Sequence, residues 1–216
     1  MKHINSAILE TKNINHFYGK EQALKNVSIK IDKGEFIAIT GESGSGKTTL
    51  LSIISTLLKA SNGEVYFQNE NFLQIENLDE FRQKNIGFIF QFHYLINYLD
   101  VLENITISSI NKDENKVDEL LKTLDITNLK NRYPDEISGG QKQRVAIARA
   151  LINSPKVIFA DEPTGNLDSK NSKNVFELFK KLSQNGTTVI VATHDKELAK
   201  MADRIIEIKD GEAYHG

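Results

Sequence analysis

A glycine-rich segment early in the chain has the residue types and spacing needed to hold a phosphate. It reads Gly41-Glu-Ser-Gly-Ser-Gly-Lys-Thr48 and fits the pattern Gly-x4-Gly-Lys-Ser/Thr. Glycines let the backbone curl until several amides point at one anion, and a following helix adds its positive N-terminus. We expect Lys47 to reach the β- and γ-phosphates of a nucleotide and Thr48 to ligate Mg²⁺. The residues expected to contact the nucleotide here are Gly41, Glu42, Ser43, Gly44, Ser45, Gly46, Lys47, Thr48 and Thr49.

Two acidic residues close an apolar run later in the chain. The run 157–160 predicts a buried strand, and Asp161 and Glu162 follow it directly. A carboxylate at the end of a buried strand is well placed for a metal, so Asp161 is the expected partner of Thr48 on Mg²⁺. The ordinary alternative is a solvated strand end that happens to be acidic. The phosphate-binding pattern upstream argues against that alternative.

A third motif, Ser138-Gly-Gly-Gln141, lies between the glycine-rich segment and the acidic strand end. It precedes a helical pattern over 141–150, so it offers a second helix N-terminus suited to a phosphate. The simpler interpretation is a serine that caps the helix, followed by two flexible glycines. Capping and phosphate binding can coexist at one helix end. One chain cannot readily bring both helix ends to the same γ-phosphate.

The elements that must position these motifs alternate between strands and helices. Such alternation favours an α/β fold with a mainly parallel sheet, and the mainly helical block of about 91–151 favours an inserted subdomain. Strands are expected at 27–32, 36–40, 63–68, 86–90, 157–160, 187–192 and 204–209, and helices at 48–58, 117–124, 141–150 and 175–182.

Composition limits the class of protein. The chain has 216 residues, 39% of them hydrophobic and 26% charged, which is ordinary for one globular domain. A net charge of −2 without a basic block disfavours a nucleic-acid partner, and the absence of cysteine excludes disulfides and thiolate metal sites. The apolar stretch within residues 1–10 is too short for a signal peptide, and no apolar run reaches the roughly 18 residues of a membrane span.

The order of these three motifs resembles the nucleotide-binding subunit of an ATP-binding-cassette (ABC) transporter, over nearly the whole chain. The resemblance implies a P-loop NTPase fold in one domain, 1–216, with a mainly parallel core sheet flanked by helices, an antiparallel N-terminal β subdomain and the helical insertion at 91–151. It implies Mg²⁺-dependent hydrolysis of ATP to ADP and phosphate. It also implies a head-to-tail homodimer, in which each ATP lies between one subunit's glycine-rich loop and the partner's Ser138, Gly139, Gly140 and Gln141.

The same resemblance assigns roles to single residues. Glu162 takes the position that polarises the attacking water, and His194 the position that contacts the γ-phosphate and that water. Gln91 matches a glutamine that touches Mg²⁺ and reports the nucleotide state to the membrane partner. Tyr18 matches a tyrosine that stacks on adenine, although an aromatic here could equally fill the core. The segment 166–168 matches a loop that crosses the dimer seam.

The segments 91–104 and 161–169 resemble the branch of lipoprotein-releasing and macrolide-export ATPases, which also holds antimicrobial-peptide exporters and the cell-division ATPase. Members often have Leu-Pro and then Thr where this chain has Ile96, Asn97 and Asp100. These departures lie in the expected docking surface. The resemblance implies a subunit that is peripheral at the cytoplasmic face of the cell membrane, held by separate permease subunits and without direct contact to cargo.

Two interpretations of what ATP hydrolysis would drive remain, and a third is disfavoured. The first is the energising subunit of a transporter, an exporter or lipoprotein-releasing type. The second is a cell-division-type ATPase that signals through a membrane partner and moves no substrate. A soluble translation or repair ATPase is disfavoured by the single cassette and the lack of a basic face. The short tail from Glu212 argues against importers that carry a C-terminal regulatory domain.

Overall fold

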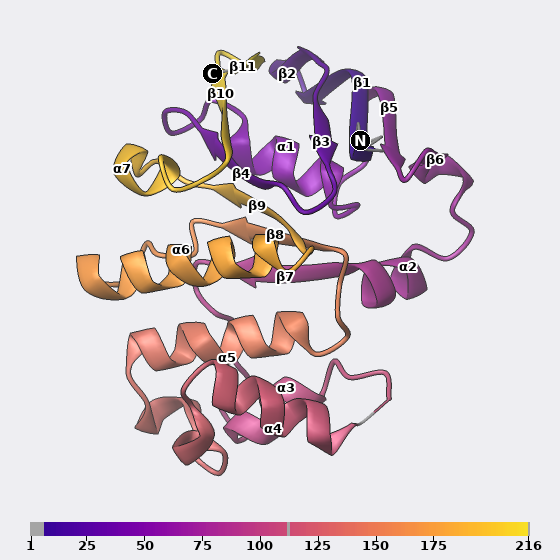
Figure 1. Cartoon of the computed structure of the whole chain (residues 1–216). Helices are drawn as coiled ribbons and strands as arrows, with labels where there is room; N and C mark the ends of the chain where they lie inside the picture. The colour runs from indigo at the N-terminus through magenta and orange to yellow at the C-terminus, as the bar shows by residue number, and fades with distance from the viewer. Residues whose placement is uncertain (1–6, 112, 216) are drawn as a thin grey trace, which may run out of the picture.

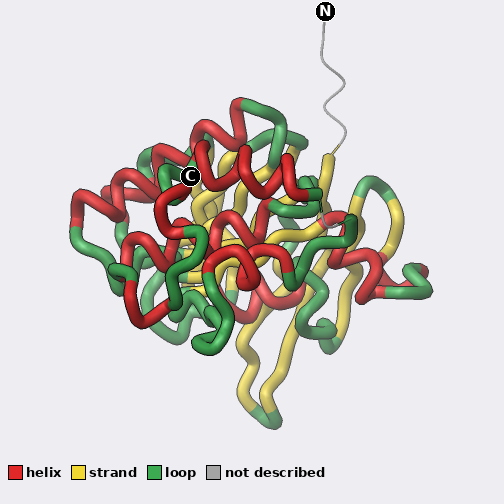
Figure 2. The backbone as a smooth tube through the Cα atoms, turned by 90° about the horizontal axis from the view of Figure 1, so that it is seen from below, coloured by secondary structure: helices red, strands yellow, loops and turns green. Residues whose placement is uncertain are grey.

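The computed structural model describes residues 7–111 and 113–215, so the first six residues of the stretch considered for a signal peptide lie outside it. Its strands form two sheets (Figure 1). The smaller sheet is antiparallel, with order β2-β1-β5-β6 and β3 paired to β1. Its strands are β1 (Ala7–Tyr18), β2 (Glu21–Val27), β3 (Lys30–Asp32), β5 (Asn62–Phe67) and β6 (Glu70–Asn71). Figure 2 shows that the β1–β2 hairpin extends beyond the helices.

The larger sheet has the order β11-β10-β4-β9-β8-β7. All neighbouring pairs in it are parallel except β10 with β11. Its strands are β4 (Phe36–Thr40), β7 (Ile86–Phe90), β8 (Val157–Asp161), β9 (Thr188–Ala192), β10 (Arg204–Lys209) and β11 (Glu212–His215). The prediction of a mainly parallel core sheet beside an antiparallel sheet is therefore confirmed.

The strands β4, β8 and β9 of the larger sheet are buried on both faces, which explains their unbroken apolar runs. Along β4, Phe36 packs with the helical side of the core while Ile37 and Ile39 pack with the side that holds β1, β2 and α1. The helices are α1 (Lys47–Ile54), α2 (Leu78–Asn85), α3 (Val101–Thr106), α4 (Glu114–Thr123), α5 (Gly139–Leu151), α6 (Ser169–Gln184) and α7 (Lys196–Ala199), with 3-10 helices η1 (Phe72–Gln74), η2 (Thr127–Leu129) and η3 (Pro134–Glu136). In Figure 1, α3, α4 and α5 gather at the end of the molecule opposite β1 and β2.

Some expected boundaries were wrong for local reasons. The strand expected at 27–32 is divided between β2 and β3, because Thr11 of β1 bonds the main chain of Ile29 through both its amide (2.8 Å) and its hydroxyl (2.9 Å). The helix expected at 48–58 ends at Ile54, since Thr56 adopts a left-handed φ of 67°. Strand β1 was not predicted, and its left-handed Asn13 (φ 50°) interrupts a regular alternation.

Across residues 7–111 and 113–215, no helix combines the length and the hydropathy that a bilayer crossing requires.

Candidate nucleotide-binding site

The glycine-rich loop connects the buried strand β4 to helix α1. Gly41 (φ 150°) and Gly46 (φ 108°) have positive φ values, and a Cβ on them would lie 2.2 Å from the Ile208 carbonyl oxygen and 2.7 Å from the Ala23 carbonyl oxygen, respectively. A side chain at either position would therefore displace main chain. Gly46 is also the N-cap of α1 and provides no side-chain cap, so the first amides of the helix stay available to an anion.

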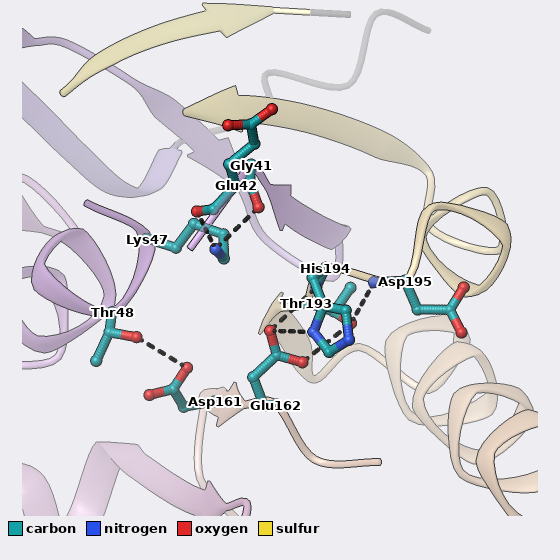
Figure 3. A network of polar contacts seen from close by, with 9 residues as sticks. All are labelled: Gly41, Glu42, Lys47, Thr48, Asp161, Glu162, Thr193, His194 and Asp195. Atoms are coloured by element: carbon teal, nitrogen blue, oxygen red, sulfur yellow. Dashed lines mark hydrogen bonds and ion pairs between the residues drawn. The ribbon is translucent and has the colours of Figure 1, made fainter. Parts of the chain in front are cut away.

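Two polar groups of the loop fit a bound phosphate. Lys47 Nζ donates to the carbonyl oxygens of Gly41 (2.9 Å) and Glu42 (2.8 Å), which holds the ammonium over the loop (Figure 3). Ser45 Oγ is buried, and among the described residues it finds no hydrogen-bond partner. A buried hydroxyl without a partner is costly, and a phosphate oxygen would satisfy it. The loop therefore suits the phosphates of a nucleotide.

A pocket of about 400 Å³ opens beside the loop. Its lining comes from the β1–β2 hairpin, the loop, the first turn of α1 and the ends of β8 and β9: Tyr18, Glu21, Ala23, Ser43, Gly44, Gly46, Lys47, Thr48, Thr49, Glu162 and His194. Tyr18 is 54% exposed, so it does not fill the core. The buried ring of His16 packs edge-to-face against the ring of Tyr18, with 4.7 Å between the ring centroids. An exposed, oriented ring at the pocket suits stacking on a base.

The two residues expected to hold Mg²⁺ lie together. Thr48 Oγ1 donates to Asp161 Oδ1 at 3.3 Å, joining the start of α1 to the end of β8 (Figure 3). Burial raises the pKa of Asp161, the hydrogen bond from Thr48 lowers it, and the charge of Glu162 raises it again. Among the described residues, no three or more His, Cys, Asp or Glu side chains are grouped so that they alone could hold a metal ion. A cation here would take its other ligands from phosphates and water, which is how Mg²⁺ is ordinarily bound.

The next residue, Glu162, has a left-handed backbone (φ 44°), and its amide donates to the Ala192 carbonyl at 2.9 Å. This conformation turns the side chain toward the end of β9. Glu162 Oε1 accepts from the amide of His194 at 3.0 Å and lies 2.9 Å from His194 Nδ1 (Figure 3). Glu162 and His194, separated in sequence, therefore form one polar unit at the pocket.

Thr193, which no sequence motif singles out, belongs to the same unit. Its fully buried hydroxyl donates to Glu162 Oε2 at 3.4 Å and accepts from the amide of Asp195 at 3.1 Å. Asp195 in turn caps α7. A hydroxyl directly before the histidine at a strand end was the available signal, but its partner carboxylate is visible only in three dimensions.

Gln91 follows β7 and lies against the loop after Glu162. Its carbonyl accepts from Asn166 Nδ2 at 3.1 Å, and a Cβ on Gly165 would come within 2.6 Å of Gln91 Nε2. These contacts join Gln91 to the segment that carries Glu162 rather than to Thr48 or Asp161.

The Ser-Gly-Gly-Gln motif begins α5, as the helical pattern predicted. Ser138 is the N-cap and forms a capping box with Gln141: Gln141 N donates to Ser138 Oγ (3.3 Å), and Ser138 N donates to Gln141 Oε1 (2.8 Å). Gly140 faces the side chain of Asn171 on α6. None of residues 138–141, all of them described, lines the pocket that contains Lys47. One chain therefore does not bring the two helix ends together.

Comparison with known proteins was consistent across sequence and structure. The sequence profile of the family described as ABC transporter matches residues 24–165. The lipoprotein-releasing system ATP-binding protein LolD of Aquifex aeolicus is 42% identical, over 94% of this chain and 95% of that protein. The macrolide export ATP-binding/permease protein MacB of Mannheimia succiniciproducens is 43% identical over 95% of this chain, which spans only 34% of that longer protein.

Among solved structures, the ATP-binding cassette MJ0796 from Methanocaldococcus jannaschii is similar with a TM-score of 0.87 at 42% identity, covering 96% of this chain and 97% of that one. That structure is a dimer in a post-hydrolysis state, bound to ADP and Pi.

Proposed function

The chain belongs to the ABC transporter family as an ATP-binding subunit, and we propose that its ATP hydrolysis requires Mg²⁺ and drives a separate membrane permease. The observation that carries this proposal is the junction of three strand ends beside the glycine-rich loop. There Thr48 lies against Asp161, and the next residue, Glu162, lies against His194. A pair of oxygen ligands beside an oriented carboxylate is the arrangement that phosphoryl transfer to water needs.

In this proposal each polar group has one task. Lys47 and the free amides of α1 bind the phosphates, and Tyr18 stacks on the base. Thr48 and Asp161 would hold Mg²⁺, and Gln91, which contacts the loop after Glu162, would join them by turning its side chain toward the ion. The ion would neutralise charge on the phosphates. The structure favours Glu162 as the base for the attacking water, because His194 orients its carboxylate at the pocket wall.

The second helix end requires a second subunit. Ser138, Gly139, Gly140 and Gln141 would approach the γ-phosphate of an ATP held by the partner, giving two ATPs in a homodimer. The loop 166–168, which leads into the N-terminus of α6, would lie at the seam. We further propose that residues 1–216 form one nucleotide-binding domain. Its helical part, about 91–151, would move together with the N-terminus of α5.

The permease would dock on the segment that follows Gln91. Three aromatic side chains there are exposed, Phe92 (65%), Tyr94 (62%) and Tyr98 (80%), and exposed aromatics of this size mark interaction surfaces. The subunit would thus be peripheral at the cytoplasmic face of the cell membrane, where ATP is available. Cargo would be handled by the permease without touching this chain.

The catalytic part of the proposal is tested by steady-state ATP hydrolysis with Mg²⁺ or with EDTA. Chelation should abolish turnover, and Glu162→Gln should lower kcat by about 10²- to 10⁴-fold while ATP still binds. Glu80→Gln, which removes one exposed carboxylate of an ion pair on α2, is the matched control and should turn over at the parent rate. Parent-rate hydrolysis by Glu162→Gln would show that another group activates the water.

The permease is tested by capture of membrane proteins from detergent-solubilised native membranes on Glu162→Gln with ATP and Mg²⁺. A polytopic membrane subunit should be recovered, and Tyr98→Lys should lose it while keeping the ATP-dependent dimer. If the recovered permease moves a cargo across the bilayer only with ATP, the transporter interpretation is supported. A membrane partner that is regulated by the cycle but moves nothing would favour the signalling alternative.

A further inference from the structure

The segment after β7 contains a tight turn of unusual geometry, which we call the aromatic turn, residues 92–94. His93 (φ 60°) and Tyr94 (φ 46°) are consecutive and both left-handed, although neither is glycine. This backbone conformation is unfavourable for residues with a Cβ and persists only where surrounding contacts impose it. His93 is buried, whereas Phe92 and Tyr94 are exposed on the surface proposed to meet the permease. Some part of the molecule must therefore hold this turn.

Arg149 on α5 supplies that restraint. Its Nη1 donates to the Tyr94 carbonyl at 2.7 Å and its Nη2 donates to the His93 carbonyl at 2.5 Å. A planar guanidinium offers parallel donors at fixed spacing, so it can hold two successive carbonyls as one unit. Within the described chain Arg149 forms no ion pair, and burial lowers its pKa. The main-chain carbonyls of His93 and Tyr94 are thus the partners of this partly buried guanidinium.

The other end of the same helix is the motif proposed to bind the partner's ATP. α5 runs from its cap at Ser138 through Gly139–Leu151, and most of its apolar residues are buried in the core shared with α3 and α4. At about 1.5 Å per residue, the cap and Arg149 are about 16 Å apart along the axis. Because close-packed interiors have low compressibility and transmit strain, a displacement at one end of this packed helix is carried to the other.

We propose that Arg149 is a positioning residue that fixes the aromatic turn to α5, so that engagement of the Ser138 end by ATP moves the surface formed by Phe92 and Tyr94. This inference rests on the proposed function and deepens it by assigning the link between nucleotide and permease to one side chain. A purely structural role predicts only a loss of stability when Arg149 changes. The positioning role predicts the loss of an ATP-dependent movement while the dimer still forms.

The chain has no tryptophan, so Phe92→Trp gives a single fluorescent reporter on the turn. In the Glu162→Gln background, ATP and Mg²⁺ should induce dimer formation, which size-exclusion chromatography detects. The same addition should shift the emission of the tryptophan reporter. Arg149→Lys keeps a cation but loses the two-pronged contact. We expect it to form the dimer and to lose the emission shift. Arg144→Lys is the matched control, since Arg144 donates to the Leu124 carbonyl instead, and it should keep the shift.

Hydrogen exchange without nucleotide tests the contact itself. Amides of residues 92–95 should exchange about tenfold faster in Arg149→Lys, as expected when about 1.4 kcal/mol of restraint is lost. Tyr94→Gly adopts positive φ without strain, so adding it to Arg149→Lys should restore part of the emission shift.

Two results would overturn the proposal: a full ATP-dependent shift in a dimer of Arg149→Lys, or a reporter that ignores ATP although the parent dimer forms. If the parent formed no dimer at all, the proposed function would fail. Unchanged exchange at 92–95 in Arg149→Lys would then reject the contact independently. Should Arg149→Lys fail to fold, Arg149→Gln, which retains an amide donor, takes its place with the same expected results.

Discussion

Helices α1 and α5 both have glycine at or next to the N-cap, and both N-termini are proposed to face a phosphate, but their caps differ. The cap of α1 is Gly46, which offers no side chain to the helix. The cap of α5 is Ser138, whose hydroxyl and main chain are already engaged with Gln141. The α1 end thus presents free amides within a pocket of its own chain, whereas at the α5 end a capping box already engages the amides of Ser138 and Gln141.

This difference predicts the order in which the two helix ends bind phosphate. A helix end with unsatisfied donors gains most from the first anion it meets. A capped helix end has fewer unsatisfied donors, so it is less destabilised without an anion. It would contact a phosphate only when another subunit presents one. The α1 end should therefore determine ATP affinity of the single chain, and the α5 end should determine whether two chains close on it.

Lys47→Ala should have the largest effect on this contrast. Removing a charged donor to phosphate costs about 1.5–3 kcal/mol, equivalent to about 10- to 150-fold in the Kd for ATP. Isothermal titration of the monomer with ATP measures it. Lys142→Ala, which removes a lysine from the first turns of α5, should leave that Kd unchanged. A similar loss in both variants would contradict the division of labour between the two helix ends.

Gly46→Ala and Gly139→Ala compare the glycines themselves. At Gly46 the new methyl would meet a carbonyl oxygen at 2.7 Å with φ at 108°, so unfolding free energy should fall by about 2 kcal/mol. At Gly139 the nearest atom outside the helix is 3.7 Å away, and alanine favours the helix, so stability should be kept or slightly raised. Urea denaturation measures both. Equal destabilisation would mean that α5 is as constrained as the loop.

Ser138→Ala should act on association rather than on binding. Loss of the cap should lower the unfolding free energy by about 1 kcal/mol. In the Glu162→Gln background, ATP-driven dimerisation, followed by analytical ultracentrifugation, should weaken by about tenfold through the lost hydroxyl. The monomer's Kd for ATP should stay within about twofold of the parent. A Ser138→Ala variant with reduced monomer affinity would place this end in the first binding step.

Asp161→Asn should have the smallest effect, and of the opposite sign. Burial raises the pKa of Asp161, so the folded state holds its charged form at a cost once the pH exceeds that raised pKa. The neutral amide removes that cost. The melting temperature should rise by on the order of a few degrees at neutral pH, and the gain should vanish as the pH falls below the raised pKa. Asp79→Asn, at a 91% exposed carboxylate, should show no such gain.

The parts of the fold that could be predicted are those in which one residue type dominates. β4, β8 and β9 are buried on both faces, so their apolar runs are unbroken and were recognised. β1 was not recognised, because its left-handed Asn13 and its mixture of polar residues break the period of two.

The site shows the same division. Thr48 and Asp161 were predicted as neighbours because the hydroxyl of the glycine-rich motif and a carboxylate at the end of a buried strand suit the same Mg²⁺, and their side chains are hydrogen-bonded. Thr193 and Arg149 were not selected, since a hydroxyl and a guanidinium acquire their roles from the groups that they face. Their partners lie 31 and about 55 residues away in sequence, and no local pattern carries that information.

The position of β4 in its sheet has a consequence for biosynthesis. Its neighbours are β9 and β10, and the amide of Phe36 donates to a carboxylate 167 residues later in the chain, Asp203. The glycine-rich loop also contacts the end of the chain, since the amide of Gly211 donates to the Ser45 carbonyl at 3.2 Å. At about 5–20 residues per second, a ribosome needs about 10–30 s between these segments. A nascent chain therefore carries the apolar β4 without its sheet for that interval, and ATP can help it fold only after synthesis has reached β10.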